Sequence, residues 1–319
     1  YQLIMHGRAQ TGLVCVSSVD DYENGIIKKH EFTRPEKELD RINHIKTSGA
    51  QTGNVFLAYR NNESLDTLIE NWKKTKSAVY DFVADDEIQH TIWVVNDTST
   101  IDNITAIFNN EIPCTYIADG HHRAASAAKV RAALGANATK NADYFLTTLF
   151  PSNQLYIMDY NRVVKDLNGL TNEAFIEAVS TKFDIEQLAK EPFSPSVLHE
   201  FGMYINGCWY QLTAKAGSFT EDPIGILDVT ILQNNILDAI LGISDPRTDV
   251  RVDFVGGIRG LQVLADRVDS GQFAAAFSLY AVTIDQLFSI ADSGNVMPPK
   301  STWFEPKLRD GLLTHLIYE

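Results

Sequence analysis

The stretch YIADGHHRAASAAKV carries basic side chains at the point where a strand-like run passes into an alanine-rich helix. The first backbone N–H groups of a helix lack intrahelical partners and lie at the positive end of its dipole, so a strand, a tight glycine turn and a helix form an anion site. Asp119 and Gly120 supply the turn, and His121, His122 and Arg123 add donors directly after it. Cations are disfavoured there unless an anion offsets them, and this conflict makes the turn the leading candidate for chemistry.

The competing interpretation is that Asp119 only caps the helix, while His121 and His122 are ordinary core or surface groups. A lone histidine would favour that interpretation, whereas several polar residues gathered at one turn favour function. A metal centre with both histidines as ligands is disfavoured, because adjacent helical residues point about 100° apart.

A second candidate lies upstream, in KKHEFTRPEKELDR. Glu31, next to His30, directly precedes an expected helix, and a carboxylate there could act as a general base or hold Mg²⁺. The alternative is a solvated charged stretch, which is what charge runs usually are.

A third candidate is ISDPRTDVRVDFVGG, which places acidic and basic residues at every second position. In an extended segment this spacing puts them on one face, where the alternating signs either pair with one another or form a further site. The residues concerned are Asp245, Arg247, Asp249, Arg251 and Asp253.

A fourth candidate is MPPKSTWFEPKL, where Lys300, Ser301 and Thr302 follow two prolines. A lysine followed by two hydroxyls suits phosphate binding. The glycine-rich run of a P-loop is absent, so the motif is weak by itself.

The elements that position these residues are read from hydrophobic periodicity. Residues 33–49 predict a helix with a start signal at Thr33 and Glu36, Pro35 in its first turn and a stop at Gly49. Strands are expected at residues 12–19, 54–60, 90–97, 114–119, 144–150, 273–282 and 311–319, and a hairpin at 202–215. Further helices are expected at residues 66–74, 124–134, 172–183, 228–242, 258–271 and 283–294.

Helices and strands mix without a clean βα repeat, so the expected fold class is α+β, or mixed α/β. The predicted division is a phosphate-binding part at residues 1–165 and a second α/β part at 166–319 that could close over the same site. The first residues read like a hairpin entered partway, and Tyr1 is no initiator methionine, so we expect a native N-terminal extension to be missing.

Composition bounds the function. The 319 residues are 45% hydrophobic, enough for one large or two ordinary cores, and the formal charge of −14 argues against a broad nucleic-acid surface. No segment reads as a membrane span or a signal peptide. Three isolated cysteines indicate neither a zinc cage nor a disulfide framework and fit a reducing cytoplasm.

Four motifs in this order resemble a prokaryotic family known as domain of unknown function 1015, and the similarity runs over essentially the whole chain. They are KKHEFTRPEKELDR, YIADGHHRAASA, ISDPRTDVRVDFVGGIRG and GNVMPPKSTWFEPKLRDGLL. That family usually extends further toward the N-terminus.

The Asp-Gly-His-His-Arg element also resembles the phosphate-binding signature of the ParB/sulfiredoxin superfamily, most closely its free-serine kinases, which use ADP or ATP and Mg²⁺. The resemblance implies that Glu31 is the catalytic base, that Asp119 and His122 are catalytic or metal-associated, and that Arg123 binds phosphate. The separation between Glu31 and Asp119 is longer than in those kinases.

The leading hypothesis is therefore an Mg²⁺-dependent, nucleotide-using phosphotransferase acting on a small hydroxyl metabolite, with L-serine as the first candidate. Gly120, His121 and Arg123, together with Lys300, Ser301 and Thr302, would bind the phosphates. The alternatives are a phosphohydrolase and a nucleotide-sensing module without turnover.

Overall fold

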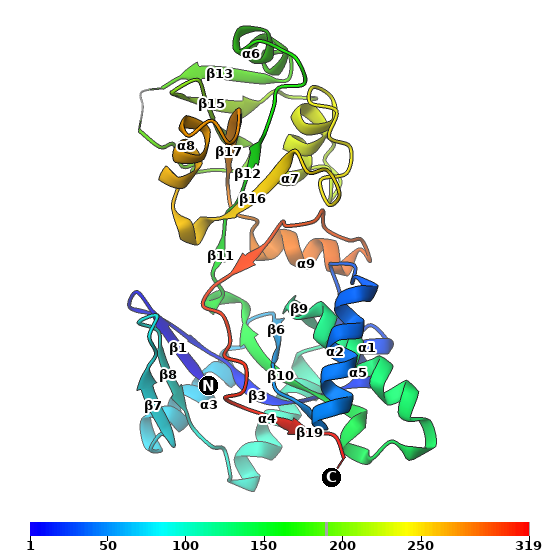
Figure 1. The fold of residues 1–319 in the computed structure, drawn as a ribbon. Coiled ribbons are helices and arrows are strands. Elements are labelled where there is room, and N and C mark those ends of the chain that lie inside the picture. Colours follow the sequence, from blue (N-terminus) through cyan, green and yellow to red (C-terminus); the bar gives the residue numbers. More distant parts are fainter. Residues whose placement is uncertain (189–190, 319) are drawn as a thin grey trace. The chain divides into compact units, whose positions relative to one another are not determined.

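The computed structural model describes residues 1–188 and 191–318. The chain forms two compact units, one made of Tyr1–Tyr156 with Phe304–Glu319 and the other of Ile157–Trp303. The chain thus leaves the first unit before the expected boundary at residue 165 and returns to it at residue 304. A return of this kind leaves no compositional mark in the sequence. Both units combine helices and sheets, which confirms the mixed α/β class (Figure 1).

The first unit is built on a mixed five-stranded sheet. Its strands, in spatial order, are β3 (Leu13–Ser18), β10 (Tyr144–Pro151), β6 (Val55–Tyr59), β9 (Thr115–Asp119) and β4 (Ile27–Lys28). β10 runs parallel to β6 and antiparallel to β3, and β9 runs antiparallel to β6 and parallel to β4. Every residue of β6 is buried, as its continuous apolar sequence requires of a central strand.

Helices cover this sheet through a shared hydrophobic core. Val19, Leu65, Ile104 and Ala124 enter that core from four different helices. These helices are α1 (Val19–Glu23), α3 (Glu63–Thr75), α4 (Thr98–Glu111) and α5 (His121–Leu134).

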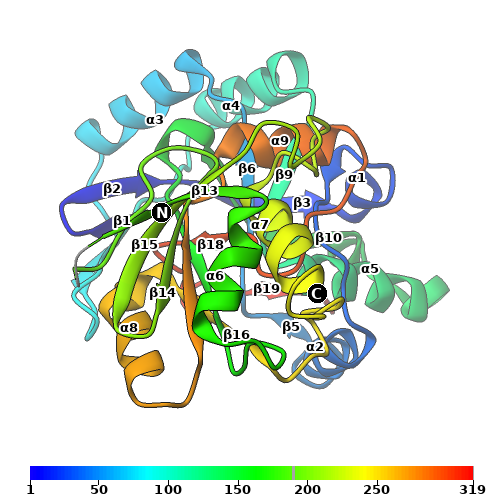
Figure 2. The same cartoon turned by 90° about the horizontal axis from the view of Figure 1, so that it is seen from above.

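A further helix, α2 (Pro35–Ser48), packs along α5, and the two lie side by side in Figures 1 and 2. The small Ser126 of α5 donates to the Glu38 carbonyl of α2 at 3.2 Å, which reflects this close approach.

The remaining strands of the first unit form two smaller sheets. One has the antiparallel order β2 (Arg8–Thr11), β1 (Gln2–Met5), β8 (Gln89–Ile92) and β7 (Tyr80–Val83). The other pairs β5 (Ala50–Gln51) with β19 (His315–Leu316) of the returning C-terminal segment. That segment, residues 304–318, is anchored further by Ile317, which packs against Ile45 of α2 and Val130 of α5.

The second unit is a six-stranded antiparallel sheet. Its spatial order is β13 (Phe183–Gln187), β15 (Cys208–Ala214), β14 (Glu200–Ile205), β17 (Ala275–Leu279), β12 (Tyr160–Val164) and β16 (Val252–Gly256). Its helices are α6 (Asn172–Ser180), α7 (Asp228–Leu232), which continues as a π-helical turn (Gln233–Asp238), α8 (Gln262–Asp269) and α9 (Ile284–Asp292). The short strands β11 (Ile157–Met158) and β18 (Trp303–Phe304) lie where the chain passes between the units.

Most elements expected from periodicity are present, with informative differences. The β14–β15 turn uses Asn206 and Gly207 at φ of 50° and 75°, as an Asn-Gly hairpin requires. The helix at 98–111 was not expected, although Asp97 accepts a hydrogen bond from the Thr100 N–H and caps it. The helix expected at 228–242 gives way after Leu232 to the π-helical turn.

The start of α2 differs from its sequence signal. The helix ends at Gly49 as expected, with that residue at a left-handed φ of 68°, but its N-cap is Arg34 and no side chain caps it. Thr33 instead donates to the buried carboxylate of Glu38. The Arg34 N–H donates to His122 at 3.0 Å, so a second helix supplies the missing acceptor.

The close packing of α5 gives a stability prediction. Ala124 is fully buried, so Ala124→Leu must displace its neighbours and should lower the free energy of unfolding by about 1–3 kcal/mol. Ala133 is an exposed alanine on the same helix, and Ala133→Leu is the matched control with an expected change near zero. Urea denaturation of both variants measures the difference, and equal stability of the two would contradict this packing.

Candidate functional site

The turn between β9 and α5 depends on a glycine. Gly120 has φ 103° and ψ 24°, in the left-handed region that side chains rarely adopt. A Cβ atom there would lie 3.3 Å from the Cα of Val55 in the neighbouring strand. This conformation lets α5 begin at His121, one residue after β9 ends at Asp119.

His121 lies beneath the turn rather than in solvent. Its side chain is 4% exposed, and its Nε2 accepts a hydrogen bond of 3.4 Å from the His30 backbone N–H. Burial lowers the pKa of His121 far below its usual range, and the nearby His30 and His122 lower it further. The neutral ring therefore carries its proton on Nδ1, which faces the Glu31 carboxylate at 3.7 Å.

His30 and Glu31 thus lie beside His121 at the turn. A solvated run of charges would make no such contacts. The His30 ring packs edge-on against that of His121 with centroids 4.5 Å apart. His30 is 2% exposed, and burial lowers its pKa to about 4, although Asp119 opposes the shift. Glu31 is 49% exposed, so its carboxylate is accessible while His121 contacts it from the protein side.

His122 connects the starts of two helices. Its Nε2 accepts the Arg34 N–H described above, and burial lowers the pKa of its ring, with Glu38 as the largest opposing influence. Neutral His122 therefore carries its proton on Nδ1.

Asp119 and Arg123 meet residues that the sequence analysis did not single out. The Lys307 ammonium lies 3.1 Å from the Asp119 carboxylate. Arg123 donates to the carbonyl of Asn54 at 3.2 Å and to the carboxylate of Asp310 at 3.3 Å. The only sequence signal for Lys307 and Asp310 was their place in the motif GNVMPPKSTWFEPKLRDGLL, and that motif does not reveal which part of the fold it joins.

A hollow adjoins Arg123. Its volume is about 30 Å³, enough for about two water molecules. Gly53 lies in its wall, and a Cβ atom there would stand 2.6 Å from an Asp310 carboxylate oxygen. The lining residues are Arg41, His44, Ile45, Gln51, Thr52, Gly53, Val55, Arg123 and Asp310.

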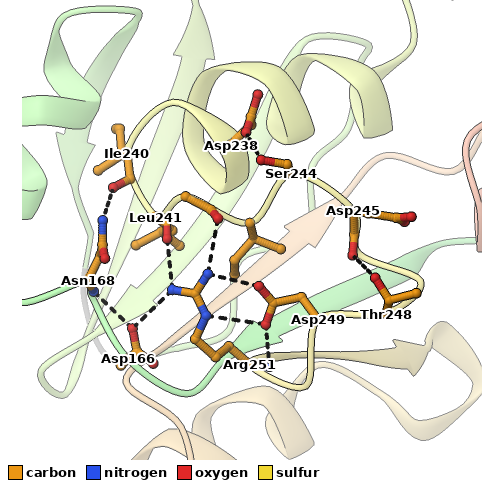
Figure 3. A network of polar contacts seen from close by, with 12 residues as sticks. Asp166, Asn168, Asp238, Ile240, Leu241, Ser244, Asp245, Thr248, Asp249 and Arg251 are labelled. Carbon is orange, nitrogen blue, oxygen red and sulfur yellow. Dashed lines mark hydrogen bonds and ion pairs between the residues drawn. The ribbon is translucent and has the colours of Figure 1, made fainter.

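The alternating charges at residues 245–253 are engaged in local pairs. Residues 245–251 form turns rather than an extended strand, so the expected common face is not present. Arg251 binds Asp249 at 2.8 Å and donates to the carbonyl of Leu241, as Figure 3 shows. It also donates to the carbonyl of Gly242 at 3.1 Å. Two other pairs are Arg247 with Asp245, and Arg267 with Asp253, each at 2.8 Å. These pairs agree with the interpretation that the alternating charges bind one another rather than a ligand.

Lys300, Ser301 and Thr302 belong to the second unit. Ser301 is buried and donates to the carbonyl of Pro298 at 2.7 Å. The Lys300 ammonium lies 5.6 Å from the centre of the Tyr160 ring, and its carbonyl accepts from Arg162 at 3.0 Å. The contacts of Lys300 and Ser301 in that unit are those of a folded loop.

The described residues contain neither a cluster of metal ligands nor a membrane-spanning helix. Within residues 1–188 and 191–318, no three His, Cys, Asp or Glu side chains converge as metal ligands. Over the same residues no helix is both long and apolar enough to cross a bilayer.

Comparison with known families places the chain. The profile described as "Protein of unknown function (DUF1015)" matches residues 1–230. The chain belongs to this family. The match confirms the family expected from the motifs, and the two C-terminal motifs lie beyond the matched residues.

The chain matches no curated protein. Solved structures similar to it include a free serine kinase in complex with AMP, at 13% identity and TM-score 0.42, covering 94% of this chain and 90% of that one. A second is a conserved hypothetical protein from Pyrococcus furiosus, at 13% identity and TM-score 0.40, covering 94% of this chain and 93% of that one. A third is SbnI with a C-terminal truncation from Staphylococcus aureus, at 11% identity and TM-score 0.45, covering 93% of this chain and 85% of that one.

The buried histidines predict acid sensitivity. The pKa of His30 falls from 6.5 to about 4 on folding, so the native state binds fewer protons than the unfolded chain, and stability is lost as the pH falls from 6.5 toward 4. His30→Asn should therefore show a smaller loss of unfolding free energy between pH 7 and pH 5 than the unchanged protein. Urea titrations at both pH values measure this loss. His6→Asn, at an exposed position, is the control and should retain the full loss, whereas equal losses in both variants would contradict the assignment.

Proposed function

We propose that this protein is a nucleotide-using phosphotransferase that phosphorylates the hydroxyl of a small metabolite, with L-serine as the first candidate acceptor and ADP or ATP as donor. The observation that carries the proposal is the grouping of Glu31, Asp119, His121 and Arg123 at the first turn of α5. Glu31 comes from a segment far from the other three in sequence, and together the four side chains offer a base, an anion site and a phosphate ligand.

The anion site rests on backbone geometry and on Arg123. The N–H groups at the start of α5 favour a negative group, and the glycine at 120 lets such a group approach the backbone. Phosphoryl transfer needs chiefly positioning and charge neutralisation, which an arginine beside a helix N-terminus supplies.

Glu31 is the proposed general base. Its carboxylate is accessible and lies 3.7 Å from the protonated Nδ1 of His121. Glu31 would accept the proton of the acceptor hydroxyl as the alcohol oxygen bonds to the terminal phosphorus. The bond from that phosphorus to the bridging oxygen then breaks, and the nucleotide leaves with one phosphate fewer. His121 in this scheme is a positioning residue.

Mg²⁺ fits the proposal as an ion held mainly by the nucleotide. Magnesium is commonly bound through one or two carboxylates together with substrate phosphates. Asp119 is the carboxylate at this turn that would contribute, in exchange for its pairing with Lys307. When bound, Mg²⁺ would neutralise phosphate charge.

Replacing the base separates chemistry from binding. Glu31→Gln should lower phosphoserine formation at least a hundredfold, because general-base catalysis is worth about 10²–10⁴ in rate, while nucleotide affinity changes little. Turnover with ADP and with ATP, each with and without L-serine, measures phosphoserine and free phosphate together. Glu36→Gln, at an exposed position in the first turn of α2, is the control and should keep full activity.

The products decide between this reaction and the alternatives. Free phosphate released without an acceptor would replace the kinase by a phosphohydrolase. Tight nucleotide binding with neither product would indicate a sensing module, and phosphoserine formation unaffected by Glu31→Gln would remove Glu31 from the mechanism.

Arg123 is tested by binding alone. Arg123→Ala should weaken ADP binding about tenfold or more, since charge-assisted hydrogen bonds are worth about 1.5–3 kcal/mol. Isothermal titration calorimetry measures the affinity, with Arg259→Ala as a control that removes an exposed positive charge from the other unit. Unchanged affinity in Arg123→Ala contradicts the phosphate-binding role.

A further inference from the structure

We infer that the hollow beside Arg123 is a second anion subsite, in which the Asp310 carboxylate holds the place of a phosphate group. The inference rests on the proposed function and deepens it, because it makes the ligand a diphosphate. One phosphate would lie at the start of α5 and the adjacent one in the hollow, with Arg123 between them.

The Arg123 guanidinium is aimed at a carboxylate as it would be at a phosphate. One terminal nitrogen donates to the Asn54 carbonyl at 3.2 Å, which fixes the plane of the group. The other faces both Asp310 oxygens, at 3.3 and 3.5 Å. These distances exceed the 2.7–2.9 Å typical of a tight charge-assisted bond. The Asp310 side chain is 53% exposed, so this pair contributes little and a phosphate can replace it.

The walls of the hollow suit an anion. Arg41 and His44 line it from α2, and residues three apart on a helix lie on the same face. Arg41 pairs with the adjacent Asp40 at the exposed surface, which leaves its guanidinium easy to redirect. Gly53 keeps side-chain atoms out of the space between Arg123 and Asp310.

Release of Asp310 requires only a side-chain movement. The backbone next to it is held independently, because the Gly311 N–H donates to the Thr52 carbonyl at 2.6 Å. The hollow of about 30 Å³ has room for about two waters but is too small for a phosphate, so rotation of the Asp310 side chain is what would admit one. Ligand binding and the Arg123–Asp310 pair are then mutually exclusive.

Pyrophosphate and orthophosphate are the probes, with affinities measured by calorimetry on the full chain. Asp310→Asn should tighten pyrophosphate binding about two- to fivefold, because it removes a competing exposed ion pair. Asp102→Asn removes an exposed carboxylate from α4 and should change the affinity by less. Arg41→Gln combined with His44→Gln should weaken pyrophosphate binding more than orthophosphate binding. Thermal unfolding checks that each variant is folded.

If Asp310 competes with phosphate for Arg123, Asp310→Asn should no longer tighten pyrophosphate binding once Arg123 is also replaced by alanine. A benefit that persists there, or one no larger than that of Asp102→Asn, overturns the inference. If ADP is turned over while Asp310→Asn leaves binding unchanged, the subsite fails and the proposed function stands. If pyrophosphate behaves as expected while ADP neither binds nor reacts, the subsite stands and the nucleotide assignment fails.

Discussion

The hydrogen bond from the His30 backbone to His121 joins two segments that are 91 residues apart, and the candidate site depends on it. His121 can accept this bond only as a neutral ring, and its burial keeps it neutral. The same tautomer presents an N–H to Glu31, whose carboxylate lies 3.7 Å away at the first turn of α5. The buried histidine pair thus holds the segment before α2 to the turn, together with the β4–β9 pairing and the bond from the Arg34 N–H to His122.

Burial also changes the electrostatics inferred from the motif. Two histidines and an arginine at a helix start suggested a concentration of positive charge that only a bound anion could offset. In the structure both histidines have lowered pKa values, and each accepts a backbone N–H, so Arg123 is the charged group that remains among them. Its charge is met by Asp310, and that of Asp119 by Lys307, so the C-terminal segment supplies a counter-charge to each.

Helix capping shows how tertiary contacts override local signals. The sequence around Thr33 and Glu36 is a recognised helix start, yet Thr33 bonds Glu38 and the acceptor for the Arg34 N–H comes from His122 on another helix. His122, a catalytic candidate in the sequence motif, therefore also stabilises the start of α2. In the second unit, the run of alternating charges around Arg251 forms pairs that stabilise a turn, because residues two apart in a turn are close enough to bind each other.

The sequence by itself determined the mixed fold class, the glycine turn after Asp119, the end of α2 at Gly49 and the Asn-Gly hairpin. These features follow from backbone preferences and hydrophobic periods that act within a few residues. It also supported the family through motifs that require no knowledge of contacts. Only the tertiary structure decided that Glu31 lies beside His121, that both histidines are neutral, and that residues 304–318 return to bring Lys307 and Asp310 to the turn. Those features depend on burial and on contacts between distant segments, and neither leaves a local pattern in the chain.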